Sequence, residues 1–147
     1  MTAGYSGTPL AKKLSLKDGM SVWADCMPAT IAKEIKSAAK VTFNKSPKPP
    51  VEAAHIFVRQ RDVLDCKLRL LLPLLAPAGF VWISWPKAVR RVSGGQPSSR
   101  LAAKVDTDIT EDTIREIALP MGLVDVKVCA VDDIWSGLKL VIRKEKR

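Results

Sequence analysis

The chain has 147 residues, of which 47% are apolar and 27% are charged, and its formal net charge is +9. This length suits one domain with a substantial core, and the composition excludes a wholly disordered or fibrous protein. The longest apolar run, Leu70–Ala76, contains Pro73 and is too short to cross a membrane. The first residues lack the apolar core of a secretory signal peptide. We therefore expect a single cytoplasmic domain over residues 1–147, with no contact with a membrane.

The positive charge is unevenly placed along the chain. Residues 1–100 carry the whole excess, whereas residues 101–147 are nearly neutral. Such asymmetry fits an anionic partner, but it also fits ordinary lysines on solvated helix faces, which is the simpler interpretation.

Neither a metal site nor a thiol-based catalytic site is expected. The three cysteines, Cys26, Cys66 and Cys129, lie far apart in the sequence, and His55 is the only histidine. No close pair of zinc ligands can be assembled, and a nucleophilic cysteine would need that one histidine as its base. Reduced thiols that are buried or partly buried are the simpler interpretation.

The first part of the chain predicts an N-terminal arm over residues 1–19, in which residues 9–16 favour a short basic helix. A strand over 20–25 then leads into a helix over 28–39, with Pro28 at its first position. A short strand at 41–43 and a proline-rich loop at 46–50 follow.

The middle of the chain contains two apolar runs, at 55–58 and 80–85, that are typical of strands covered on both faces. Between them, Asp62 is a suitable N-cap for a helix that extends to about residue 72. Residues 87–107 form a long basic loop, because Lys87–Lys104 holds five Lys or Arg residues, no acid and a cluster of Gly, Pro and Ser.

The last part of the chain predicts a helix followed by two strands. Asp108 and Glu111 have the spacing of a capping box, and Gly122 is placed to end the helix. Alternating apolar residues predict strands near 124–130 and 138–143, and the short connection between them makes these strands antiparallel.

This order of elements predicts a three-layer, Rossmann-like α/β fold whose mostly parallel sheet ends in a C-terminal antiparallel hairpin. A closing antiparallel pair after the last helix is the topology of the class I methyltransferases. The fold is expected in a truncated form, because the interval from Val41 to His55 is too short for a further strand–helix–strand unit of about 30 residues.

The residues that would hold S-adenosylmethionine in such a fold are missing from the sequence. The predicted first strand ends at Asp25 and continues into Cys26-Met27-Pro28, without the glycine that lets a backbone approach the ligand. The second strand ends at Asn44-Lys45, where an acid for the ribose hydroxyls would be required. Binding of S-adenosylmethionine is therefore disfavoured, and no cofactor is predicted.

Four blocks of the sequence resemble a bacterial domain-of-unknown-function family of short hypothetical proteins. The blocks are GYSGTPLAKKL (4–14), SWPK (84–87), DITED (108–112) and LVDVKVCAVDDIWSGLKLVIRKE (123–145). The resemblance covers both ends of the chain and implies a Rossmann-like fold, but it carries no established reaction.

The candidate ligand-binding residues follow the strands. In open α/β sheets, ligands bind beyond the carboxyl ends of the strands, where Trp side chains offer flat surfaces and cations contact anions. The residues expected at that edge, including one from the arm, are Tyr5, Arg59, Trp85, Lys87, Asp132 and Trp135. Core packing of the two tryptophans and simple solvation of Lys87 are the alternatives.

Three functions remain open, of which the first is favoured. The chain is a non-catalytic, degenerate methyltransferase-like domain that binds a small anionic or aromatic ligand or a protein partner. Alternatively, it is a diverged methyltransferase-like enzyme that uses the same edge. The third is a nucleic-acid-binding module using the 87–104 loop and the N-terminal lysines, which is disfavoured because no aromatic residue lies among the cations of that loop.

Overall fold

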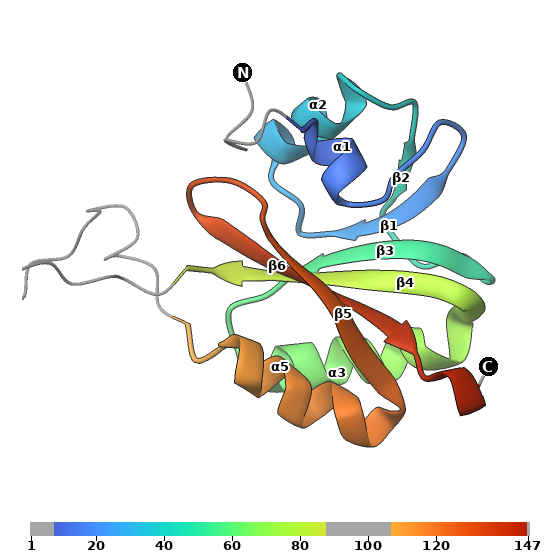
Figure 1. Ribbon diagram of the computed structural model, residues 1–147, viewed down its shortest axis with the longest axis vertical. Coiled ribbons are helices and arrows are strands. Elements are labelled where there is room, and N and C mark those ends of the chain that lie inside the picture. Colours follow the sequence, from blue (N-terminus) through green and yellow to red (C-terminus); the bar gives the residue numbers. More distant parts are fainter. Residues whose placement is uncertain (1–7, 88–106, 147) are drawn as a thin grey trace, which may run out of the picture.

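The computed structural model describes residues 8–87 and 107–146, which form one mixed sheet between two helical layers (Figure 1). The strands are β1 (Ser21–Asp25), β2 (Thr42–Asn44), β3 (Val51–Phe57), β4 (Leu75–Pro86), β5 (Leu123–Ala130) and β6 (Trp135–Ile142). The helices are α1 (Leu10–Lys13), α2 (Ala29–Lys36), α3 (Arg61–Leu71) and α5 (Glu111–Ala118). Short 3-10 turns follow as η1 (Leu72–Leu74), η2 (Leu119–Met121) and η3 (Lys144–Lys146).

The six strands lie in the order β2-β1-β3-β4-β6-β5. β1 pairs in parallel with β2 and β3, and β3 pairs in parallel with β4. β6 is antiparallel to both of its neighbours, β4 and β5. The predicted α/β fold with a mostly parallel sheet and an antiparallel C-terminal pair is confirmed.

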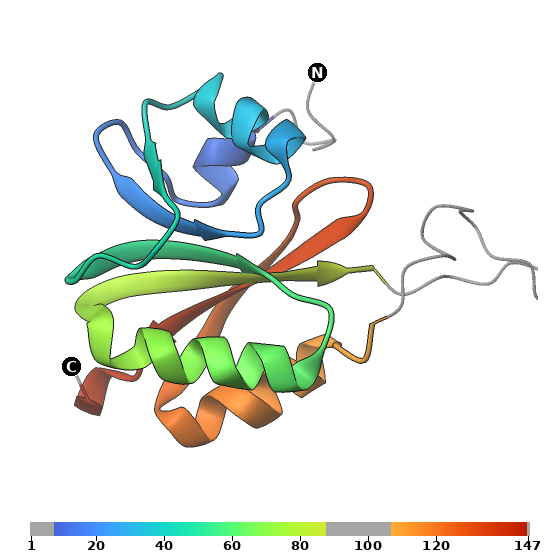
Figure 2. The same ribbon diagram turned by 180° about the vertical axis from the view of Figure 1, so that it is seen from behind.

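Each face of the sheet has its own apolar core. α1 and α2 cover one face, and α3 and α5 cover the other (Figures 1 and 2). Leu14 and Ile35 pack with Trp82 on the first face, whereas Leu64 and Ile114 belong to the cluster on the second. Adjacent strand residues alternate between faces, so Trp82 and Trp85 belong to opposite cores, as their spacing predicts.

Both central strands begin earlier than their apolar runs indicate. β3 starts at Val51, immediately after the proline-rich loop, and Val51 pairs with Leu75 at the start of β4. β4 thus contains Pro77, which precedes the apolar run at 80–85 that predicts this strand. Proline is tolerated near the beginning of a strand, where a missing N–H costs few ladder hydrogen bonds.

The predicted N-caps of the two helices on the second face are wrong. α3 is preceded by Gln60, and the backbone N–H of Arg61 donates to the side chain of Asp108 at 2.8 Å. α5 is capped by Thr110, whose hydroxyl accepts from the N–H of Thr113. Asp108 therefore caps the neighbouring helix rather than its own, a tertiary contact that local spacing does not reveal.

The thiols differ from expectation. Cys26 and Cys66 are exposed and Cys129 is partly buried, so the expectation of buried or partly buried thiols is wrong for the first two. Within residues 8–87 and 107–146, no helix has the length and hydropathy needed to span a membrane. Residues 1–7 of the predicted arm and residues 88–106 of the predicted basic loop lie outside the described residues.

Candidate functional site

The chain changes direction across the sheet between β1 and β3. After β1 it crosses to β2 on one side, and it then returns to β3 on the other side. Crevices form at the carboxyl ends of strands at such a switch point, and they are the usual ligand sites of open α/β sheets. A hollow of about 690 Å³ lies there, which we call the carboxyl-edge pocket. It is lined by Cys26, Pro28, Phe57, Val58, Arg59, Gln60, Val63, Lys67 and Trp135.

The turn after β1 forms one wall of the pocket. Cys26 has a φ of 58°, which is the left-handed conformation that favours glycine. Its side chain is exposed and lines the pocket, and Pro28 directly precedes the first turn of α2. The backbone of this turn thus has a glycine-like bend, but side chains occupy the space that glycine would leave open.

An ion pair links this wall to α3. The ammonium of Lys67 on α3 donates to the carboxylate of Asp25 at the end of β1. The two side chains are only 26% and 17% exposed, so the pair is partly shielded from water. Asp25 is therefore neutralised by Lys67, and this contact fixes α3 against the end of β1.

The lining also includes two aromatic residues and an arginine. Phe57 and Trp135 meet edge to face with ring centres 4.9 Å apart, and both are largely buried. The backbone of Arg59 is anchored at its carbonyl by the hydroxyl of Thr107 and the N–H of Asp108. Among the described residues no ion pair engages the Arg59 side chain, so it offers a positive charge to the pocket.

His55 lies inside β3, whereas the apolar run at 55–58 predicts that it is the first residue of a strand. Its Nε2 is 2.6 Å from the hydroxyl of Ser84, and its ring stacks on Phe57 with centres 4.3 Å apart. Burial lowers the pKa of His55 to about 3. The ring is neutral and does not line the pocket, which leaves the pocket cysteine without the base that a catalytic pair needs.

The predicted site residues separate into several places. Arg59 and Trp135 meet in the carboxyl-edge pocket. Lys87 donates its ammonium to the carbonyl of Asp132 at 2.7 Å, away from the pocket lining. The carboxylate of Asp132 accepts the N–H groups of Ile134 and Trp135, and so it shapes the turn before β6.

The two remaining predicted residues are Trp85, which does not line this pocket, and Tyr5. Trp85 belongs to the core on the α3 and α5 side, and it borders a separate shallow hollow beside the first turn of α5. Tyr5 lies outside the described residues. Register explains the separation of the two tryptophans, because Trp135 pairs with Pro86 and therefore faces the side opposite Trp85.

Sequence reasoning missed the contribution of Cys26 and Lys67. Lys67 lies one helical turn beyond Val63 on α3, so both point back toward the start of the helix and the sheet edge. That spacing is the one signal that could have placed Lys67 near Asp25. Within residues 8–87 and 107–146, no group of three His, Cys, Asp or Glu residues is arranged for a metal ion.

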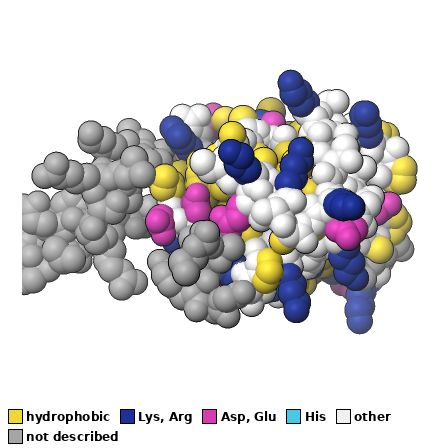
Figure 3. All heavy atoms as spheres, turned by 90° about the horizontal axis from the view of Figure 1, so that it is seen from above, with side chains coloured by type: hydrophobic (Ala, Val, Ile, Leu, Met, Phe, Trp, Pro, Cys, Tyr) yellow, Lys and Arg dark blue, Asp and Glu magenta, His cyan; other side chains and the backbone are white. Residues whose placement is uncertain are grey.

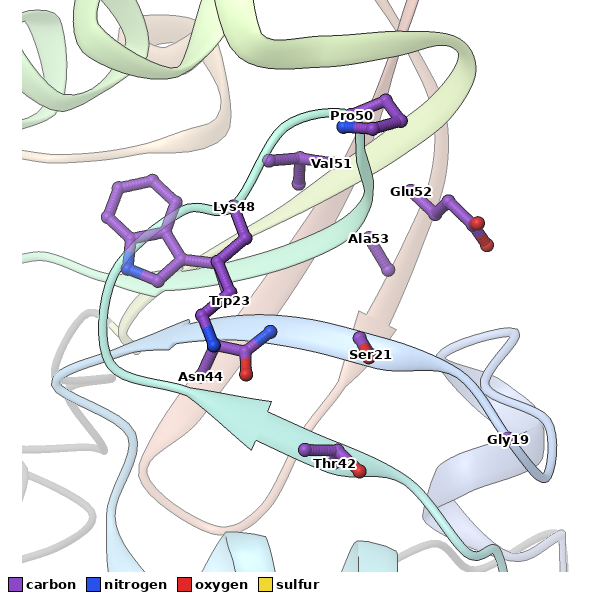
Figure 4. Close-up of a pocket in the computed structure, with 10 residues that line it drawn as sticks. All are labelled: Gly19, Ser21, Trp23, Thr42, Asn44, Lys48, Pro50, Val51, Glu52 and Ala53. Carbon is purple, nitrogen blue, oxygen red and sulfur yellow. The ribbon is translucent and has the colours of Figure 1, made fainter.

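A second hollow, of about 440 Å³, lies on the α3 side of β1 and β2 (Figure 4). Ser21 and Thr42 pair across its floor, as do Trp23 and Asn44, and Lys48 extends over it. The indole N–H of Trp23 already donates to the carbonyl of Lys45. This hollow is polar and lies along the strands rather than beyond their carboxyl ends, so it is a weaker candidate than the carboxyl-edge pocket.

The fold is that of the class I methyltransferases. A protein from Sulfolobus solfataricus that is assigned as a type 11 methyltransferase superimposes on this chain with a TM-score of 0.57 at 16% identity. The match covers 91% of this chain and 89% of that one. A SAM-dependent methyltransferase from Bacteroides fragilis, in complex with S-adenosyl-L-homocysteine, gives 0.57 at 9% identity, over 92% and 77%. The LepI complex with SAM gives 0.52 at 12% identity, and this chain spans 48% of LepI.

At these identities the likeness establishes the fold alone. The sequence matches no protein-family profile and no curated protein. The resemblance to a bacterial domain-of-unknown-function family therefore stays a prediction, whereas the methyltransferase-like fold is confirmed.

Proposed function

We propose that this chain is a small-molecule-binding domain that takes an anionic, aromatic ligand in the carboxyl-edge pocket and does not transfer methyl groups. The observation that carries the proposal is the pocket at the switch point, which combines Trp135 and Phe57 with the cation of Arg59. Its volume of about 690 Å³ is typical of a small-molecule site.

The complexes of LepI and of the Bacteroides fragilis methyltransferase suggest S-adenosylmethionine as a ligand, but the pocket residues of this chain do not fit it. No glycine follows Asp25 to let the protein backbone approach the ligand closely, and Cys26 and Pro28 line the pocket there instead. Asp25 is already neutralised by Lys67. β2 ends in Asn44 and is followed by Lys45, so no carboxylate stands at its end to accept the ribose hydroxyls.

The pocket also lacks a group suited to general base catalysis. The lining residues include neither histidine nor carboxylate, and Lys67 is held in its ion pair with Asp25. A general base must reach the substrate proton with a pKa near the working pH. His55 meets neither condition, because it is buried and its pKa is lowered to about 3.

One observation favours the alternative of a diverged enzyme at the same edge. The φ of 58° at Cys26 gives the turn after β1 the bend that glycine provides in nucleotide-binding folds. A non-glycine residue is held in this conformation at a cost of about 1–3 kcal/mol, and such strain concentrates at functional sites. Binding of S-adenosylmethionine would support that enzyme over our proposal.

A thermal-shift experiment separates the two functions. We expect phenyl phosphate or adenosine monophosphate, at about 10 mM, to raise the Tm of the wild-type protein, since a ligand at 100 times its Kd adds about 2.7 kcal/mol. Arg59→Gln removes the pocket cation and should abolish the rise. Arg69→Gln removes an exposed cation on α3, outside the pocket, and should preserve it.

S-Adenosylmethionine and S-adenosylhomocysteine are expected to leave the Tm unchanged. A rise with either one contradicts the proposal and supports the enzyme. Absence of any rise with both phenyl phosphate and adenosine monophosphate, or a rise that persists in Arg59→Gln, contradicts the proposed ligand class.

A further inference from the structure

The positively charged side chains of the two helical layers differ in whether they form ion pairs. On the second face, Arg61, Arg69 and Arg115 each form an ion pair with Asp or Glu. On the first face, the lysines of α1, α2, their flanking residues and the β5–β6 pair form no ion pair among the described residues. They are Lys12, Lys13, Lys17, Lys33, Lys36, Lys40, Lys127 and Lys139, and we call them the lysine face.

Two lysines of this face oppose each other directly. Lys127 on β5 and Lys139 on β6 are register partners, although like charges directly opposite each other on neighbouring strands are destabilising. Both ammonium groups reach toward α1, where Lys127 donates to the carbonyl of Lys13 and Lys139 to the hydroxyl of Ser15. Lys13, Lys127 and Lys139 are thereby brought together from three elements.

Few acids balance these charges. Within α1, α2 and the residues that flank them (10–20 and 29–41), the acids are Asp18, which accepts the backbone N–H of Lys40, and Glu34. Figure 3 looks onto this side and shows basic side chains spread across it, with acidic ones fewer between them. Most of these lysines are exposed, so their charge is presented to solvent, and Lys36 and Lys139 also lie over the rings of Phe43 and Phe80.

We propose that the lysine face binds the phosphodiester backbone of nucleic acid. Its cations are spread over two helices and a strand pair, which suits a chain of phosphates better than one small anion. Binding at this face is independent of the carboxyl-edge pocket. It shares the N-terminal lysines with the nucleic-acid-binding alternative of the sequence analysis, but it uses α2 and the β5–β6 pair in place of the 87–104 loop, of which residues 88–104 lie outside the described residues.

The chemistry of the face favours nucleic acid over an anionic membrane. Membrane-binding surfaces combine cations with apolar side chains that enter the lipid. The large exposed apolar side chains that the structure describes lie on α3, η2 and β5, and none lies on α1 or α2. Because the part of this face that the structure describes has no exposed aromatic side chain for base stacking, the contacts are electrostatic, so binding should be insensitive to sequence and steeply dependent on salt.

The test compares two variants that remove equal charge from opposite faces. Lys33→Gln with Lys36→Gln removes two cations from α2, and Arg61→Gln with Arg69→Gln removes two from α3. All four side chains are exposed, and unfolding temperatures of both variants verify the fold. Binding of a labelled 20-nucleotide single strand and of the matching duplex is followed by fluorescence anisotropy at 50 and 200 mM salt.

We expect the wild type to bind both oligonucleotides at 50 mM salt and to lose at least tenfold in affinity at 200 mM. The α2 variant should bind at least fivefold more weakly at 50 mM and show a shallower salt dependence, since each phosphate contact adds about 0.9 to the slope for duplex DNA. The α3 variant should bind within twofold of wild type.

Three outcomes overturn the proposal. The first is no binding at 50 mM salt. The second is an equal loss in the α2 and α3 variants, which would assign binding to net charge rather than to the face. The third is tighter binding to vesicles containing 30% phosphatidylserine than to either oligonucleotide, which would assign the face to a membrane.

Discussion

Replacing Trp82 with alanine is expected to lower the free energy of unfolding by about 3–5 kcal/mol, the range for removal of a large buried aromatic side chain. Trp82 is 1% exposed in the centre of β4 and belongs to the core beneath α1 and α2. Its indole N–H also donates to the carbonyl of Leu14 at 2.9 Å, just after α1. Trp82 is therefore a central part of the contact that holds the four-residue helix α1 on the sheet.

Urea denaturation measures this loss, and Trp82→Phe is the matched control. Phenylalanine retains most of the volume but leaves the carbonyl of Leu14 without its buried donor, so a smaller loss of about 1–3 kcal/mol is expected. Amide hydrogen exchange at Leu14 should accelerate more in Trp82→Ala than in Trp82→Phe. Equal stabilities of the two variants would contradict the packing role that we assign to Trp82.

Acidification is expected to destabilise the protein between pH 6.5 and 4.5 by about 2–3 kcal/mol, at a slope approaching 1.4 kcal/mol per pH unit. His55 has a pKa of about 3 in the folded protein, because it is buried, against 6.5 when unfolded. Below pH 6.5 the unfolded chain binds a proton that the folded chain excludes. The stability is therefore complete above pH 6.5 and falls progressively as the pH drops toward 3.

The sequence contains one histidine, so the slope between pH 6.5 and 5.5 can be attributed to it. Urea denaturation at pH 7.5, 6.5 and 5.5 should show the slope in the wild type. His55→Gln should be less stable at pH 7.5, because it disrupts the contact with Ser84, but nearly independent of pH across this range. A slope that persists in His55→Gln would show that another group is responsible.

The arrangement of the sheet was predictable because its signals are local. Apolar runs and alternation identified the strands, and the three-residue spacing of Trp82 and Trp85 placed them on opposite faces. His55 was misplaced because the strand containing it begins at Val51, next to prolines that interrupt the apolar pattern. Its contact with Ser84, which lies 29 residues further along the chain, depends on the register of β3 against β4, and no local pattern in the sequence specifies that register.

The site was predictable only in part. Arg59 and Trp135 were expected at the carboxyl edge, and they do line its pocket. Lys87 and Asp132 hold the turn before β6 instead. The carboxylate of Asp132 bonds locally to the N–H groups of Ile134 and Trp135, and Lys87 reaches the carbonyl of Asp132 because the ends of β4 and β6 lie side by side. The lysine face could not be inferred, since each lysine alone looks like an ordinary solvated residue. The clustering of these charges depends on the pairing of Lys127 with Lys139 and on the packing of α1 beside them.

The four tryptophans provide the most direct measurement of the central claim, that the carboxyl-edge pocket binds an anionic, aromatic ligand other than S-adenosylmethionine. Trp135 lines this pocket, whereas Trp23 and Trp85 border other hollows and Trp82 is in the core. Their indole N–H signals in a ¹H–¹⁵N spectrum, assigned by Trp→Phe variants, are followed during titration with phenyl phosphate and with S-adenosylhomocysteine. We predict that phenyl phosphate shifts the Trp135 signal selectively and that S-adenosylhomocysteine shifts none. A Trp135 signal that responds to S-adenosylhomocysteine, or one that ignores phenyl phosphate, would contradict the claim.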